Sequence, residues 1–142
     1  MTLRIGVVGA GQMGRYHIER LAGSVPDAEV VAVSDVFIEG AKQVAEQVGA
    51  RAYSDGHELV ADDQVEAVLI ASPGFTHEEF TLACLATDKP VLCEKPLAPT
   101  IDACVRVLEA EAAKPRRLIQ VGFMRRYDDG FRALKAAADA GR

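Results

Sequence analysis

Residues 3–14 read LRIGVVGAGQMG, and this stretch decides the fold. An apolar run ends in Gly9, Gly11 and Gly14, spaced G-x-G-x-x-G, and a helical pattern of apolar residues follows at once. The pattern predicts a buried strand that turns tightly into a helix whose first backbone N–H groups are left free. Gly9 would permit the turn, Gly11 would let a pyrophosphate approach the main chain, and Gly14 would let helix and strand pack closely.

The start of this predicted helix is a potential anion-binding site. Its free N–H groups and the positive end of the helix dipole both attract a phosphate group. We therefore expect Gln12 and Met13, which lie between the second and third glycines, to bind a cofactor together with Gly9, Gly11 and Gly14. Glycine spacing alone is weak evidence, so the interpretation depends on the rest of the chain.

Size and charge limit what the chain can be. Its 142 residues suffice for one domain with a hydrophobic core, so we expect a dinucleotide-binding domain over residues 1–142. A composition of 49% hydrophobic and 26% charged residues is typical of globular proteins. The formal net charge of −5 argues against nonspecific nucleic-acid binding, which needs a basic face. It does not argue against a dinucleotide, because backbone amides can hold the phosphates.

The cysteines and the N-terminus predict where the protein works. Cys84, Cys93 and Cys104 are odd in number, widely spaced and surrounded by apolar residues, which fits neither a disulfide framework nor a zinc site. We expect them to be small buried side chains in a reducing, cytoplasmic setting. No signal peptide and no apolar run of membrane-spanning length is present, so no membrane partner is expected.

Strand and helix patterns alternate along the whole chain. The alternation predicts an α/β domain of the Rossmann type, a doubly wound parallel sheet of about six strands with helices on both faces. The predicted strands are 3–8, 29–35, 51–53, 66–71, 90–93 and 117–122. One predicted helix directly follows the first strand, and others cover 38–48, 76–87, 100–113 and 128–140. Asp55 could cap a further short helix through Leu59 and Val60.

Asp35 ends the second predicted strand, about 20 residues after the glycines, where a carboxylate can accept hydrogen bonds from the adenosine ribose. It would also repel a 2′-phosphate, which favours NAD over NADP. The alternative is that Asp35 caps the helix that begins near Ile38. We favour the ribose role because Asp35 completes the glycine pattern at the expected distance.

Polar residues follow three later apolar strands. In open α/β sheets the carboxyl ends of the strands face one ligand-binding crevice. We therefore expect the segments 72–77, 94–96 and 124–127 to face the glycine loop. Among these residues, Lys95 could hydrogen-bond a substrate hydroxyl beside the nicotinamide and help to relay its proton.

Each candidate also has a purely structural interpretation. Lys95 could be a surface lysine paired with the neighbouring glutamate. His77, at a helix start, and His17, on an apolar helix face, are more often structural, and His57 has no functional argument. Arg125 could meet an anionic or polyhydroxylated substrate, although solvated surface arginines are as common. No cluster of residues has the spacing of a metal site.

Taken together, GAGQMG, Asp35, SPGFTH, CEKPLA and VGFMRRYD resemble the glucose–fructose oxidoreductase and inositol dehydrogenase family (Gfo/Idh/MocA) over essentially the whole chain. The E-K-P segment is the family's most diagnostic short motif. The segment QVGFMRRYD looks most like the family's inositol-oxidising members, which oxidise myo-inositol with NAD to scyllo-inosose. The chain departs from many members at Gly74, where they have asparagine.

The resemblance implies roles for individual residues. Lys95 would be the catalytic family lysine, touching both the nicotinamide and a substrate hydroxyl, and Arg125 would bind the polyol substrate. Pro96 would carry a cis peptide bond. The residues expected to bind NAD, beside the glycine loop and Asp35, are Ser72, Pro73, His77, Glu94 and Lys95.

The resemblance also implies a second domain, which would supply a catalytic aspartate and histidine and most of the sugar pocket. We expect that domain to be absent from residues 1–142, so that this chain binds NAD without turnover. The parent enzyme would be a homo-oligomer. The alternatives are a dehydrogenase of another sugar or cyclic polyol, and a non-catalytic module that senses NAD.

Overall fold

The structure is a computed structural model that describes residues 1–141. Its centre is a six-stranded sheet in the order β3-β2-β1-β4-β5-β6, in which every neighbouring pair is parallel. The strands are β1 (Leu3–Val8), β2 (Ala28–Ser34), β3 (Arg51–Tyr53), β4 (Ala67–Ile70), β5 (Val91–Cys93) and β6 (Ile119–Val121). The predicted doubly wound α/β fold is confirmed.

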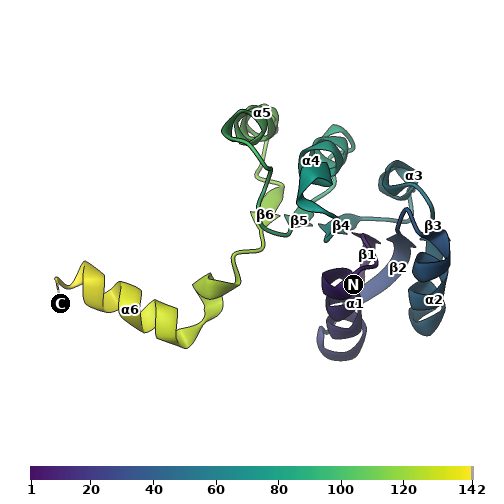
Figure 1. The fold of residues 1–142 in the computed structure, drawn as a ribbon, viewed down its shortest axis with the longest axis horizontal. Helices are drawn as coiled ribbons and strands as arrows, with labels where there is room; N and C mark the ends of the chain where they lie inside the picture. The colour runs from purple at the N-terminus through teal and green to yellow at the C-terminus, as the bar shows by residue number, and fades with distance from the viewer. Residues whose placement is uncertain (142) are drawn as a thin grey trace.

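Helices cover both faces of this sheet (Figure 1). In Figure 1, α1 and α2 lie on one face, and α3, α4 and α5 lie on the other. The helices are α1 (Gln12–Ser24), α2 (Ile38–Val48), α3 (Gly56–Ala61), α4 (His77–Ala86), α5 (Ile101–Ala112) and α6 (Asp129–Asp139), with short 3-10 turns η1 (Gly74–Thr76) and η2 (Met124–Tyr127). Within this described part, no helix is long and apolar enough to cross a membrane.

The strand order reverses between β1 and β4, the two central strands. From β1 the chain winds outward through β2 and β3, and then returns to the other side of β1 to form β4, β5 and β6. Loops that leave β1 and β4 therefore diverge to opposite faces, and the crevice between them is the usual ligand site of such sheets.

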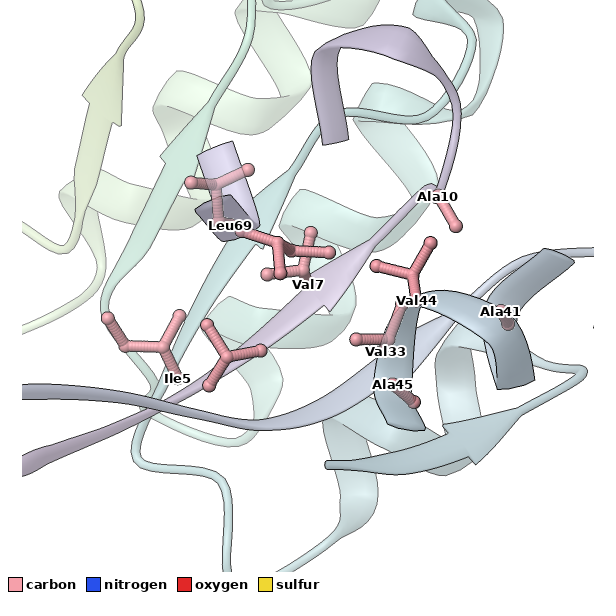
Figure 2. Packing of buried hydrophobic residues seen from close by; sticks show 10 residues of the cluster. Ile5, Val7, Ala10, Val33, Ala41, Val44, Ala45 and Leu69 are labelled. Carbon is pink, nitrogen blue, oxygen red and sulfur yellow. The ribbon is translucent and has the colours of Figure 1, made fainter. Parts of the chain in front are cut away.

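Successive side chains of the central strands point to opposite faces of the sheet and form two separate hydrophobic cores. Val7, Val33 and Leu69 face α1 and α2, where they pack with Ile18 and Val44 in one buried cluster (Figure 2). A second buried cluster lies on the opposite face, against α3 and α4, and includes Val8, Ala32, Leu59, Val68, Ile70 and Cys84. Burying one leucine or isoleucine contributes about 1.5–3 kcal/mol, so these clusters hold the sheet between its helices.

Short polar side chains begin the helices where the sequence predicts them. Asp55 accepts a hydrogen bond from the His57 N–H at the start of α3, Thr100 accepts from Ala103 N–H at α5, and Asp128 accepts from Phe131 N–H at α6. Gly49 ends α2 in the left-handed conformation, with φ +71°.

Asp62 follows the last residue of α3, and its side chain connects the end of that helix to β3. It accepts hydrogen bonds from Gln64 N–H and from the Tyr53 hydroxyl, and its other contact is with the Arg51 guanidinium. Burial alone would raise the pKa of Asp62, but these hydrogen bonds and the charges of Arg51 and Lys89 outweigh it and hold the pKa below its ordinary value.

The structure differs from the prediction in four places. Residues 74–76 form a 3-10 turn before α4, and Met124–Tyr127 form another that was not predicted. Cys84 and Cys93 are buried as expected, whereas Cys104 is only partly buried. The predicted last helix exists, but α6 lies away from the sheet and none of its described residues is buried (Figure 1).

Candidate functional site

The glycines at the end of β1 have three different surroundings. Gly9 has φ +101°, and a Cβ atom there would lie 2.6 Å from the Ser72 backbone nitrogen. A Cβ atom at Gly14 would overlap the Gly9 carbonyl oxygen. At Gly11, in contrast, a Cβ atom would meet no atom within 4 Å. Folding therefore requires glycine at Gly9 and Gly14, whereas Gly11 faces open space in front of α1.

Asp35 holds the glycine loop in place. One carboxylate oxygen accepts the Ala10 N–H at 2.8 Å, and the other accepts the Phe37 N–H at 2.9 Å. The second bond lies just before α2, so the helix-start interpretation is partly right, although the N-cap itself is Phe37. Each carboxylate oxygen keeps a free lone pair that a ribose hydroxyl can use.

Arg15 holds the same loop from the other side. Its Nε–H donates to the Ala10 carbonyl oxygen at 3.0 Å. The backbone of Ala10 is thus held at its N–H by a carboxylate and at its carbonyl oxygen by a guanidinium. Two charge-assisted hydrogen bonds preset the loop in the shape that a phosphate needs.

A cavity of about 740 Å³ opens in front of this loop, within the size range of small-molecule sites. Seven of the predicted cofactor-binding residues border it: Gly9, Gly11, Gln12, Met13, Asp35, Ser72 and Pro73. Phe75 and Thr76 of the predicted segment 72–77 also line the cavity, together with residues that were not predicted to do so: Val36, Ser54, Asp55, Gly56 and Phe80. The glycine loop and the loop after β4 therefore share one cavity, as predicted.

The loop after β4 is tied to the turn after β5 by His77. The imidazole is 1% exposed, and its two nitrogens lie 2.6 Å from the Pro96 carbonyl oxygen and 2.9 Å from the Ser72 carbonyl oxygen. Its predicted contact with a cofactor stays a prediction, and in this structure the ring is buried with both nitrogens engaged. His77 connects a cavity-lining loop to the turn that carries Lys95.

The Glu94–Pro96 turn lies beside the cavity rather than on its wall. Glu94 is paired with His17 of α1, whose Nε2 lies 2.8 Å from the Glu94 Oε1. The Lys95–Pro96 peptide bond is cis, as the family resemblance implies. Lys95 is exposed, and among the described residues its ammonium forms no ion pair with Glu94, so the alternative of a Glu94–Lys95 surface pair is not observed.

Arg125 is not brought to this turn. Its guanidinium lies 3.3 Å from Asp128 and 4.8 Å from the centre of the Phe131 ring, both in the η2–α6 segment. No contact with Lys95 or the cavity occurs within residues 1–141. Its predicted contact with substrate stays a prediction.

Other reactive groups have structural surroundings. Burial raises the pKa of Cys84 to about 12 and that of Cys93 to about 11, which keeps both thiols protonated. His57 pairs with Glu79 at 2.6 Å on an exposed surface. Among residues 1–141, no group of three acidic, histidine or cysteine side chains could hold a metal ion.

Sequence reasoning missed the partner of His17 and the partners of His77. His17 lies in α1 and His77 begins α4, and each ring contacts the Glu94–Pro96 turn, which is distant in sequence, so no local spacing signals these pairs. The cavity wall formed by Val36, Ser54 and Phe80 was findable in part, because two of these residues lie directly after or near the ends of β2 and β3.

Comparisons with known proteins show the family of the chain. Residues 3–123 match the family model described as "Oxidoreductase family, NAD-binding Rossmann fold" (GFO_IDH_MocA). The chain is 51% identical over 144 residues to an inositol 2-dehydrogenase of Pseudomonas savastanoi pv. phaseolicola, and 52% identical over 144 residues to one of Azotobacter vinelandii. Each alignment covers 100% of this chain and 43% of the relative.

A solved structure has the same fold as this chain. Myo-inositol dehydrogenase from Lactobacillus casei, in complex with NAD(H) and myo-inositol, superimposes with a TM-score of 0.93 at 44% identity and covers 99% of this chain and 42% of the other. The present chain thus spans less than half the length of the relatives that it matches. By its fold, its glycine loop and these matches, the chain belongs to the Gfo/Idh/MocA oxidoreductase family and is its NAD-binding Rossmann domain.

Proposed function

We propose that this chain is the cofactor-binding part of an NAD-dependent inositol dehydrogenase. The parent enzyme would transfer a hydride from a carbinol carbon of myo-inositol to NAD and leave the 2-keto sugar. The observation that carries the proposal is the cavity of about 740 Å³, bordered by an open glycine loop and by Asp35. The matching relatives named inositol 2-dehydrogenase support the choice of substrate.

The sheet topology supports one orientation of the cofactor. Asp35 follows β2, so the adenosine half would lie over that side of the sheet, with the pyrophosphate at the N-terminus of α1. The nicotinamide half would then extend across β4 toward β5, where Glu94, Lys95 and Pro96 follow the strand. Met13 and Gln12 would contact the cofactor at the helix start, and Ser72 and Pro73 at its middle.

The chain's own residues would bind the cofactor and polarise the substrate. NAD supplies the hydride acceptor when it is bound. Lys95 would donate a hydrogen bond to the reacting hydroxyl and stabilise the charge that develops on its oxygen. Arg125 would bind a further hydroxyl of the polyol. The base that removes the hydroxyl proton would come from the part of the parent enzyme outside this chain.

The proposal includes the setting of the parent enzyme. Its substrate would be a small polyol, and the parent would assemble as a homo-oligomer without nucleic acid or membrane. A cytoplasmic location is supported by three cysteines that remain free, two of them buried.

Fluorescence titration with NADH tests the cofactor function of this chain, with NADPH as the comparison. We expect saturable NADH binding that is clearly tighter than NADPH binding, because the Asp35 carboxylate would repel a 2′-phosphate. Lys135→Gln, far from the cavity in α6, is the matched control and should bind NADH unchanged. Absence of saturable NADH binding would refute the cofactor function.

The substrate is tested on the parent enzyme. This chain joined to the rest of its parent sequence should reduce NAD with myo-inositol, and scyllo-inositol and glucose serve as competing substrates. Turnover of glucose but not of either inositol would refute the inositol assignment while leaving NAD binding intact.

A further inference from the structure

We infer that His17 is a positioning residue for the nicotinamide end of the site. It acts through Glu94 and the turn that carries Lys95. The inference rests on the proposed function, because it needs NAD to lie across β4 toward β5. From its place on the apolar face of a helix, His17 was expected to be structural.

The contact between His17 and Glu94 is short and largely shielded. The His17 Nε2 lies 2.8 Å from the Glu94 Oε1, and the two side chains are 22% and 14% exposed. A carboxylate only accepts hydrogen bonds, so the ring donates from Nε2. A shielded charge-assisted hydrogen bond of this length is far stronger than one on an open surface.

Glu94 joins three parts of the fold. Its Oε1 is held by His17 from α1, and its Oε2 accepts the Lys95 N–H at 3.3 Å. On a third side lies Gly122, just after β6, where a Cβ atom would come within 3.3 Å of the Glu94 carboxylate. The carboxylate therefore has one position that satisfies α1, the Lys95 turn and the end of β6 together.

The pair connects the helix that would hold the pyrophosphate to the turn that would meet the nicotinamide. His17 lies on α1, whose first turn would hold the pyrophosphate, and Glu94 directly precedes Lys95. Without the His17 donor, the Glu94 carboxylate would lose its only side-chain partner among the described residues and would be free to swing toward solvent. The turn that contacts the nicotinamide would then be less ordered before binding, which weakens affinity for that half alone.

The test compares a ligand that contains nicotinamide with one that lacks it. NADH and ADP-ribose share the adenosine and pyrophosphate groups, and only NADH reaches the Glu94–Pro96 turn. We expect His17→Leu to weaken NADH binding by about three- to tenfold and to change ADP-ribose binding by less than about twofold. His17→Gln keeps a donor at similar reach and should restore most of the NADH affinity.

Two further variants make the test specific. His57→Leu removes the other histidine–glutamate pair, which lies at 2.6 Å on the surface, and should change neither affinity. Gly122→Ala crowds the Glu94 carboxylate from the other side, so it should also weaken NADH more than ADP-ribose. Thermal unfolding of every variant checks that the fold is intact.

Each outcome decides the matter. An equal loss of NADH and ADP-ribose affinity in both His17 variants would show that His17 only stabilises α1, and would overturn the inference. Unchanged NADH affinity in His17→Leu would overturn it as well. If the unmodified chain binds ADP-ribose but not NADH, the proposed function fails first, a result that differs from either pattern above.

Discussion

Gly11→Ala separates the demands of folding from those of binding. A Cβ atom at this position would meet nothing within 4 Å, and the backbone angles of φ −70° and ψ −169° suit alanine. Alanine is a poorer N-cap than glycine by a few tenths of a kcal/mol to about 1 kcal/mol. It also lowers the entropy of the unfolded chain, which stabilises the fold by about 0.4–1 kcal/mol. These terms offset each other, so we expect stability to change by less than about 0.5 kcal/mol.

Binding should respond very differently. The methyl group would occupy the space through which a pyrophosphate approaches the first N–H groups of α1. Losing one or two hydrogen bonds to a charged phosphate costs about 1.5–3 kcal/mol, so we expect NADH affinity to fall by about 10- to 100-fold. Gly14→Ala is the contrasting variant: its Cβ atom would overlap the Gly9 carbonyl oxygen, and we expect a loss of about 2–4 kcal/mol in stability.

The assay is urea unfolding followed by circular dichroism, with NADH titration of each variant that remains folded. If Gly11→Ala binds NADH as tightly as the unmodified chain, the glycine loop is not the pyrophosphate site. If Gly11→Ala lowers the free energy of unfolding as much as Gly14→Ala does, the space around the added Cβ atom does not determine the effect of alanine on stability at these two positions. Either result would refute the reasoning.

Three other measurements probe different parts of the structure. Asp35→Ala should weaken NADH binding and narrow the preference for NADH over NADPH; an unchanged preference would refute the ribose role. It should also cost about 1–2 kcal/mol in urea unfolding, because the Ala10 and Phe37 N–H groups both lose their acceptor. Iodoacetamide should alkylate Cys104 in the folded chain before Cys84 or Cys93, because the thiols of these two are buried. Mass spectrometry gives the order of alkylation, and alkylation of Cys84 before Cys104 would contradict the prediction. The lowered pKa of Asp62 means that its stabilising contribution is present above the unfolded-state pKa and is lost as pH falls below about 4. Asp62→Asn should therefore flatten the pH dependence of unfolding below about pH 4, and an unaltered slope would contradict the assignment.

Much of the fold could be predicted because its signals are local. The apolar runs that end at Val8, Ser34 and Cys93 are short and rich in branched residues, as strands buried on both faces must be. Asp55 and Thr100 mark helix starts through hydrogen bonds that span only two or three residues. Strand ends were less accurate, since β6 covers only Ile119–Val121 of the predicted 117–122.

The candidate site was predictable only as far as its parts are local. The glycine loop and Asp35 follow a fixed spacing along the chain, and the structure places them around one cavity. His77 shows the opposite case: its type and its position at a helix start gave no sign that it would bind two carbonyl oxygens of separate loops. Arg125 was expected at the crevice because it follows a predicted strand. In the structure it lies in η2, and its guanidinium contacts Asp128 and the Phe131 ring of α6.

The double engagement of Asp35 has a consequence for how this domain can evolve. The same carboxylate fixes the Ala10 amide, lines the cavity and, under the proposed function, would bind the adenosine ribose. A lineage that exchanges this aspartate for a residue tolerant of a 2′-phosphate also loosens its glycine loop in the same step. A change of cofactor therefore has to be preceded or accompanied by a second substitution that supplies a new acceptor for that amide. Intermediates with only one of the two changes would be weak binders, which keeps the choice of NAD historically stable.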